Sequence, residues 1–189
     1  MYWIHPDYPD AASIFHSHLN RLIQMTNKKN GTPVYICIGT PAIIGDCLGP
    51  VIGTILSEYL PGQVYGTLDA PIHALNFNRS CREIKKQHQR PFIIAIDAAL
   101  GNISQSGYIL LKKGPLRPGK GVGKKLPPIG DLQITGVFQD IFDPKAGRQM
   151  AVFGKCISQG ILKLYPAFQR PEQGDFCLLY TSPSPRDTR

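Results

Sequence analysis

Val34-Tyr-Ile-Cys-Ile-Gly39 is a short and nearly continuous apolar run, and it is the strongest indication of the fold class. A run of this length without polar alternation is typical of a strand that is buried on both faces of a parallel sheet. A second run of the same kind, Phe92-Ile-Ile-Ala-Ile-Asp97, ends on an acid. We therefore predict two parallel strands that are covered on both faces.

Apolar residues at helical spacing surround these two strands. Gly45-Asp46 opens a segment in which such residues recur as far as Leu60, and Pro61-Gly62 ends it. The same spacing predicts helices over residues 14–25, 72–88 and 146–164. Residues 107–112 and 132–137 alternate as strands do, and residues 63–68 are a further predicted strand. Because parallel neighbours need crossover connections, this alternation predicts an α/β fold, a doubly wound and mostly parallel sheet with flanking helices.

The length of 189 residues and the hydrophobic content of 42% suit one domain with one core. We expect a single α/β domain over residues 1–176, with the clearest pattern over 30–165. The last thirteen residues, 177–189, differ in composition and resemble the translated read-through of a sequencing adapter. We exclude them from the fold as an artefact, and the alternative is a native disordered tail.

Several classes of protein are disfavoured by the composition. No run approaches the ~20 consecutive apolar residues of a membrane span, and the first residues lack the pattern of a secretory signal. We therefore expect a cytoplasmic protein with no membrane partner. The five cysteines are odd in number and show no CxxC spacing, which argues against a disulfide framework and a zinc ribbon.

The chain is basic, with 21 Lys and Arg against 13 Asp and Glu and a net charge of +8. Such an excess attracts nucleic acid or acidic protein. The positive residues gather at Lys85-Lys86, between Lys112 and Lys125, and near the C-terminus, with few of the aromatic residues that stack on bases. We expect a protein or peptide partner, with acidic character, rather than nucleic acid.

Two carboxylates lie just after, or at the end of, the two buried strands. Asp46 follows Ile38-Gly39 and Asp97 ends the second run. Open α/β sheets place their ligand crevice at this edge, so the two groups converge if the strands are neighbours. Two close acids do not both ionise easily, so such a pair can divide into a general acid and a general base. The alternatives are a helix N-cap at Asp46 and a hydrogen-bonded strand-end acid at Asp97.

Other polar groups could join the same crevice. His73 follows a turn after the next strand, and we expect it to contact substrate; the alternative is a surface histidine. With Asp46 and Asp97 it would make a metal set, but no HExxH-like spacing supports one, so we expect no metal. Cys47 is a minor candidate for a nucleophile, since a thiol at a helix start has a lowered pKa.

The segment Gly114–Gly130 is a long loop rich in glycine and proline. It comes within one residue of a phosphate-binding loop but fails it, because Gly121 replaces the hydroxyl residue and two prolines remove amide donors. We therefore expect no nucleotide and no other cofactor. A basic loop beside a substrate groove is the better interpretation, with these residues attracting an acidic chain: Arg117, Lys120, Lys124 and Lys125, together with Lys112 and Lys113.

Several short motifs occur in order along the chain. They include Cys37-Ile-Gly-Thr40, Gly45-Asp-Cys-Leu-Gly-Pro50, Pro71-Ile-His-Ala74, Ile94-Ala-Ile-Asp-Ala98 and Leu126-Pro-Pro-Ile-Gly-Asp131. This set resembles the YyaC sporulation protein family, also called DUF1256, from about residue 34 to residue 152. That family is similar in turn to the germination protease of spore formers and, more distantly, to hydrogenase maturation proteases.

The resemblance implies a phosphorylase/hydrolase-like fold and a location in the forespore or spore interior. It also implies that Asp46 and Asp97 match an aspartate pair proposed as catalytic in the germination protease. Pro41 and Ala70 depart from the family pattern, since acidic residues are usual at both positions. We expect a spore-associated peptidase that acts on acidic spore proteins. The alternatives are a catalytically silent binding protein of the same fold and a metal-recognising maturation protease.

Overall fold

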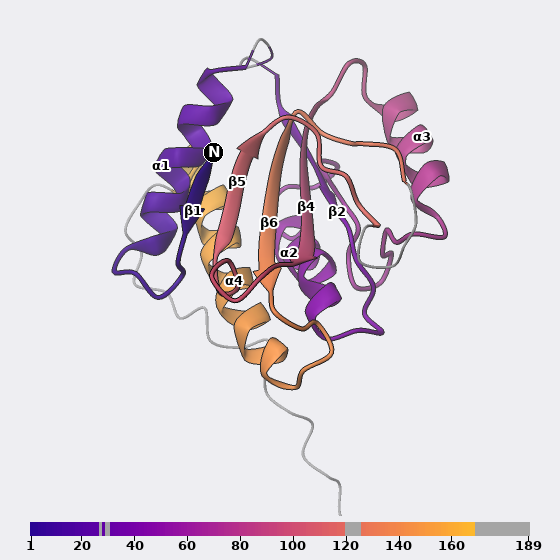
Figure 1. Ribbon diagram of the computed structural model, residues 1–189. Helices are drawn as coiled ribbons and strands as arrows, with labels where there is room; N and C mark the ends of the chain where they lie inside the picture. Colours follow the sequence, from indigo (N-terminus) through magenta and orange to yellow (C-terminus); the bar gives the residue numbers. More distant parts are fainter. Residues whose placement is uncertain (27, 29–30, 120–125, 169–189) are drawn as a thin grey trace, which may run out of the picture.

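The computed structural model describes residues 1–26, 28, 31–119 and 126–168. This part of the chain forms one sheet of six strands and four α-helices (Figure 1). The strands are β1 (Tyr2–Ile4), β2 (Pro33–Cys37), β3 (Val64–Tyr65), β4 (Phe92–Leu100), β5 (Ile109–Lys113) and β6 (Leu132–Phe138). The helices are α1 (Ala11–Gln24), α2 (Leu48–Ser57), α3 (Phe77–Gln87) and α4 (Lys145–Leu162), with short 3₁₀ turns η1 (Gly45–Cys47) and η3 (Pro166–Phe168).

The sheet is mixed, with strand order β1-β5-β6-β4-β2-β3. Strands β6, β4, β2 and β3 are parallel, whereas β5 runs antiparallel to β6 and β1 antiparallel to β5. The α/β class is confirmed. The predicted parallel, doubly wound arrangement holds for these four strands but not for β5 and β1. The reason is the connections of β5. Residues 101–108 and the described parts of 114–131 hold no helix, so the chain turns back at β5 instead of crossing over.

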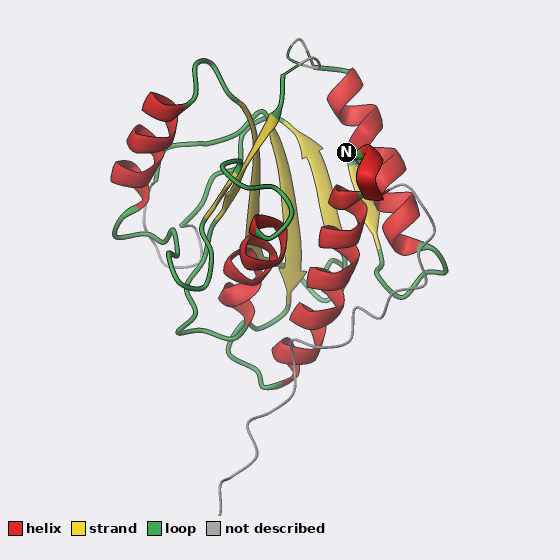
Figure 2. Ribbon diagram, turned by 180° about the vertical axis from the view of Figure 1, so that it is seen from behind, coloured by secondary structure: helices red, strands yellow, loops and turns green. Residues whose placement is uncertain are grey.

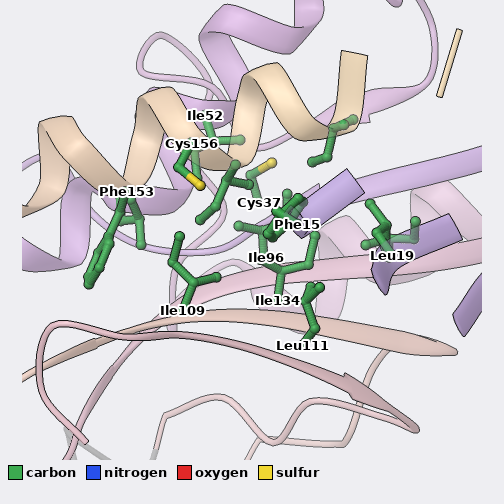
Figure 3. Close-up of a cluster of buried hydrophobic side chains, with 14 of the residues drawn as sticks. Phe15, Leu19, Cys37, Ile52, Ile96, Ile109, Leu111, Ile134, Phe153 and Cys156 are labelled. Atoms are coloured by element: carbon green, nitrogen blue, oxygen red, sulfur yellow. The ribbon is translucent and has the colours of Figure 1, made fainter. Parts of the chain in front are cut away.

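Helices cover the two faces of the sheet unequally. Figure 2 shows α1, α2 and α4 on one face, where their side chains pack against alternate residues of the strands, such as Tyr35 and Cys37. Figure 3 shows part of this larger core, including Phe15, Ile96 and Phe153. The other face carries Val34, Ile36 and Ile38 and is covered by α3 and by the segment around Leu116 and Ile129. Burial on both faces explains the continuous apolar runs of β2 and β4.

The boundaries of several elements differ from the predictions. Strand β4 continues three residues past Asp97, and β1 shows no clear pattern in the sequence. The helix expected over 72–88 begins only at Phe77. Ile72 instead forms a parallel bridge with Ile38, and the Asn76 side chain bonds to the backbone of Pro71 and His73. The strand expected over 63–68 is limited to Val64–Tyr65.

Three further expectations concern membrane spans, the cysteines and the C-terminal tail. No helix in the described part of the chain has the length and apolarity that crossing a membrane requires. Cys37, Cys47, Cys81 and Cys156 are free thiols. The expected artefact tail, 177–189, lies outside the described residues.

Backbone packs directly against backbone at the carboxyl end of β2. Gly39 has φ +147°, and a Cβ there would overlap the carbonyl oxygen of Asp46. Gly49, in the first turn of α2, approaches Ile38 so closely that a Cβ would overlap the Ile38 carbonyl oxygen and amide nitrogen. Only glycine permits both contacts, and together they hold the start of α2 against the end of β2.

We predict that Gly49→Ala lowers the free energy of unfolding by about 1–3 kcal/mol, the usual cost of overpacking, because backbone atoms cannot move aside. The matched control is Gly154→Ala in α4, where a Cβ would meet Val51 Cγ1 at 3.7 Å, an ordinary contact. There the helix propensity of alanine should raise stability by up to ~1 kcal/mol. Urea denaturation measures both changes. Equal effects of the two substitutions would contradict the packing described for Gly49.

Candidate active site

A cavity of about 650 Å³ lies at the carboxyl edge of the parallel strands, the lower edge in Figure 1. Strand β2 leads into its wall at Ile38, β4 contributes Asp97 to Leu100, and the loop before α2 contributes Asp46. The cavity thus lies where open α/β sheets place their ligands. Its lining is mainly apolar and is made by these residues: Ile38, Gly39, Thr40, Ile43, Asp46, His73, Ala74, Leu75, Asp97, Ala98, Ala99, Leu100, Arg117, Pro118, Gly119, Leu126 and Ile141.

Asp46 and Asp97 both line this cavity. Their strands β2 and β4 are parallel neighbours, with Cys37 opposite Ile96, and the Ile38 amide donates to the Ile96 carbonyl at 2.7 Å. This register brings the residues after Ile38 alongside Asp97. The structure therefore brings the two carboxylates to one crevice, although Asp97 lies within β4, opposite Thr135 of β6, rather than at its end.

Asp46 is held by the loop that β2 leads into. The Thr40 amide donates to Asp46 Oδ2 at 2.8 Å across that loop. Asp46 makes no capping bond to α2, so the N-cap alternative is wrong. Burial raises the pKa of Asp46, while the Thr40 amide and nearby His73 act in the opposite direction. Its ionised form therefore has partial compensation for desolvation.

The ionised form of Asp97 has less compensation for desolvation than that of Asp46. Burial raises the pKa of its carboxyl well above the ordinary value, and the negative charge of Asp46 raises it further. The Ala98 amide, 2.9 Å from Asp97 Oδ1, offsets this only in part. Desolvation and the neighbouring charge thus disfavour the ionised form of Asp97, and this form has less compensation than ionised Asp46.

His73 also lines the cavity and is half-buried, so it is not a freely exposed surface histidine. The Leu75 amide donates to its Nδ1 at 3.3 Å. In the neutral imidazole this contact favours the tautomer with its hydrogen on Nε2, a donor available to a ligand. Its role toward a substrate stays a prediction.

Only some of the basic residues predicted to attract a substrate line the crevice. Arg117 lines the cavity and is exposed, whereas Lys112 and Lys113 do not line it, and Lys113 Nζ instead donates to the Met25 carbonyl after α1 at 2.9 Å. Leu116 and Ile129 pair by two backbone hydrogen bonds of 2.8 and 2.9 Å, which join the two sides of the loop at its base. Lys120, Lys124 and Lys125 lie outside the described residues.

The structure does not support two alternatives from the sequence analysis, a Cys47 nucleophile and a metal site. Burial and the charge of Asp46 raise the pKa of the Cys47 thiol, which is opposite to the lowering expected at a helix start, and Cys47 does not line the cavity. Among the described residues, no group of three or more His, Cys, Asp and Glu side chains could hold a metal ion. Asp46, His73 and Asp97, the set on which the metal-recognising alternative depends, are therefore not such a group. Pro41 and Ala70 are exposed and lie outside the cavity lining.

The sequence analysis missed the apolar walls and the Thr40 donor. Leu75 is 81% exposed and Leu100 is 50% exposed, yet both line the cavity. The signal for Leu100 was present, because the apolar run of β4 continues after Asp97. Ile141 comes from a loop with no periodic pattern, and Leu75 lies in a stretch that was assigned to the helix 72–88, so the sequence placed neither residue at the crevice.

Comparison with known proteins gives two findings. The family model described as "Protein of unknown function (DUF1256)" matches residues 6–153. "Uncharacterized protein YyaC" of Bacillus subtilis (strain 168) is 45% identical over 113 residues, which are 58% of this chain and 55% of that protein. The chain thus spans about half the length of the curated relative that it matches.

We predict that Asp97→Asn stabilises the protein at pH 7. The buried carboxyl has a raised pKa, so the wild type loses stability as pH rises from about 4, the ordinary pKa of Asp, toward the raised value. Asparagine avoids this loss, and the gain should shrink toward pH 4. Urea denaturation between pH 4 and pH 8 measures it, with Asp69→Asn in an exposed turn as the control. A gain that does not change with pH would contradict the raised pKa.

Proposed function

The chain belongs to the family described as "Protein of unknown function (DUF1256)", and from the crevice we propose that this member is a spore-associated peptidase. In this proposal Asp46 and Asp97 hydrolyse a peptide bond. The observation that carries it is the pair itself, two carboxyl groups in one cavity with pKa values that are both raised and to different extents. Strongly shifted pKa values in a cleft are a feature of catalytic acids and bases. The spore setting rests on the resemblance of the motifs to the YyaC sporulation family.

The two charge states suit activation of water against an amide. Ionised Asp46 takes a proton from water while the water oxygen attacks the carbonyl carbon, and protonated Asp97 gives its proton to the carbonyl oxygen. The resulting gem-diol collapses as Asp46 passes its proton to the departing nitrogen and a diol hydroxyl returns one to Asp97. The products are an amine and a carboxylic acid, and both carboxyl groups regain their starting states.

The walls of the cavity favour a polypeptide substrate with an apolar side chain near the cleaved bond. Ile43, Leu75 and Ile141 surround the pair with apolar surface, and the volume of about 650 Å³ lies within the range of ligand pockets. Arg117 at the same cavity supports an acidic residue elsewhere in the substrate. Lys120, Lys124 and Lys125 belong to the same basic loop in the sequence and extend this proposal to acidic spore proteins.

A second candidate function is a binding protein that holds a polypeptide without cleaving it. The exposure of Leu75 and Leu100 beside the cavity favours this candidate, because exposed apolar side chains around a cleft suit binding without chemistry. Incubating the wild type with a spore-protein mixture and sequencing the new termini separates the two. New termini support the peptidase, and capture of proteins without new termini supports the binding protein.

We predict that Asp46→Asn and Asp97→Asn each reduce hydrolysis of a peptide that contains an identified cleavage site by ~10²-fold or more, the usual loss for an acid or base group. The measurement is kcat/KM on purified variants whose folding is checked by circular dichroism. Asp69→Asn and Cys47→Ser serve as controls and should retain activity. Full activity in both active-site variants would end the aspartate mechanism, and loss in Cys47→Ser alone would indicate thiol chemistry.

We also predict that Leu75→Ser weakens binding of a peptide with an apolar residue at the cleaved bond by about tenfold, because the wall loses apolar contact with the ligand. Titration of the inactive Asp97→Asn protein with labelled peptide measures binding without cleavage. Leu68→Ser is the matched control, since Leu68 is 40% exposed and lies outside the cavity lining. Equal losses in the two variants would show that the apolar wall does not select the ligand.

A further inference from the structure

A second cavity, of about 440 Å³, lies at the opposite edge of the sheet, the upper edge in Figure 1. It forms where α3 leads into β4 and where both ends of the Gly114–Gly130 loop meet the sheet. Its residues are Lys28, Lys85, Arg90, Pro91, Ile93, Pro115, Pro128, Ile129, Gly130 and Asp131. Ile93 and Asp97 are four residues apart in β4, so the two cavities are separated by about 13 Å along the strand.

Three cationic side chains and one carboxylate line the cavity, and the carboxylate already has hydrogen-bond and ion-pair partners. Asp131 Oδ2 accepts a hydrogen bond from the Ile93 amide at 2.9 Å, and both Asp131 oxygens lie 3.2 Å from Lys28 Nζ. Lys28 Nζ also donates to the Pro91 carbonyl at 3.0 Å. Lys28 and Asp131 therefore neutralise each other and link the chain segments that form this wall of the cavity.

Lys85 and Arg90 remain without an ion pair among the described residues, although both line the same cavity. By contrast, exposed Arg79 pairs with Glu83 at 2.9 Å on the same helix as Lys85. Both side chains are exposed, so water screens part of the repulsion between the two like charges, and an anion bound by both would reduce it further. The charge of this cavity thus favours an anionic ligand.

The prolines in the wall offer no backbone hydrogen-bond donors, so the cationic side chains are the main donors. Pro91, Pro115 and Pro128 have no amide hydrogen and restrict the backbone around the opening. Arg90 has φ +50°, a left-handed conformation that residues other than glycine rarely adopt and that occurs preferentially at ligand sites. Ile93 and Ile129 also line the cavity, and both are buried in the core on this face of the sheet.

We infer that this cavity binds a small phosphate monoester, independently of the proposed peptidase activity. The arginine fork matches two phosphate oxygens, and Lys85 supplies the second positive charge for a dianion. A single carboxylate would balance only one of the two cations. The volume of about 440 Å³ leaves room for an organic group beside the phosphate, and the prolines of the lining offer it apolar contact.

The test is calorimetric titration of the full chain with three probes: phenyl phosphate, inorganic phosphate and acetate. Phenyl phosphate should bind tightest and acetate weakest. Lys85→Gln and Arg90→Gly should each weaken phenyl phosphate binding about tenfold or more, the range expected for a charge-assisted hydrogen bond. Glycine at position 90 accepts a positive φ, so this variant removes the guanidinium without adding backbone strain.

Lys86→Gln and Arg79→Gln are the matched controls, because each removes one charge from α3 outside the cavity. They should leave binding within twofold of wild type. Equal weakening in the control and cavity variants would overturn the proposal in favour of attraction by net charge. No saturation of the wild type at millimolar phenyl phosphate would also overturn it, as would tight binding of an oligonucleotide that all four variants weaken equally.

Discussion

The close backbone contact between the end of β2 and the start of α2 is the constraint on which the crevice depends. Gly39 turns the chain directly after the strand, and Gly49 lets α2 lie against Ile38 with no side chain between them. The loop between these glycines is therefore pinned at both ends. Asp46 lies within it and reaches back to the Thr40 amide. Neighbouring β4 runs parallel to β2 and extends past it, which brings Asp97 to the same crevice.

The electrostatics of the crevice follow from this placement. Both carboxyl groups lose solvent and each accepts one backbone amide, but Asp46 also has a histidine nearby, while Asp97 is more deeply buried and faces the charge of Asp46. Such an arrangement costs stability at neutral pH, because an ionised Asp97 is poorly compensated. Proteins retain a destabilising arrangement of this kind where activity requires it, which supports a chemical role for the pair over a purely structural one. The cavity with the cations at the other edge of the sheet is separated from the pair by about 13 Å along β4.

The sequence predicted those parts of the fold that burial controls. Strands covered on both faces leave continuous apolar runs, so β2 and β4 were recognisable, and the helices between them indicated parallel strands, whereas their pairing as neighbours was left as a condition. The direction of β5 was not recognisable, because an alternating strand has the same pattern in either direction, and only its connections without a helix reveal the reversal. In the crevice, Asp46 and Asp97 were predictable from their strands. Leu75 was not, because it lies in a stretch that was assigned to a helix, and Ile141 was not, because a loop residue reaches a site through tertiary contacts alone.

The central claim is that Asp46 and Asp97 titrate as an interacting pair in one crevice. The most direct measurement is an NMR titration of the side-chain carboxyl carbons in the wild type and in Asp46→Asn. The account predicts that Asp97 titrates well above the ordinary pKa of Asp in the wild type, and that removal of the neighbouring charge lowers its pKa while burial keeps it raised. An ordinary pKa for Asp97, or a raised pKa that Asp46→Asn leaves unchanged, would contradict the pair.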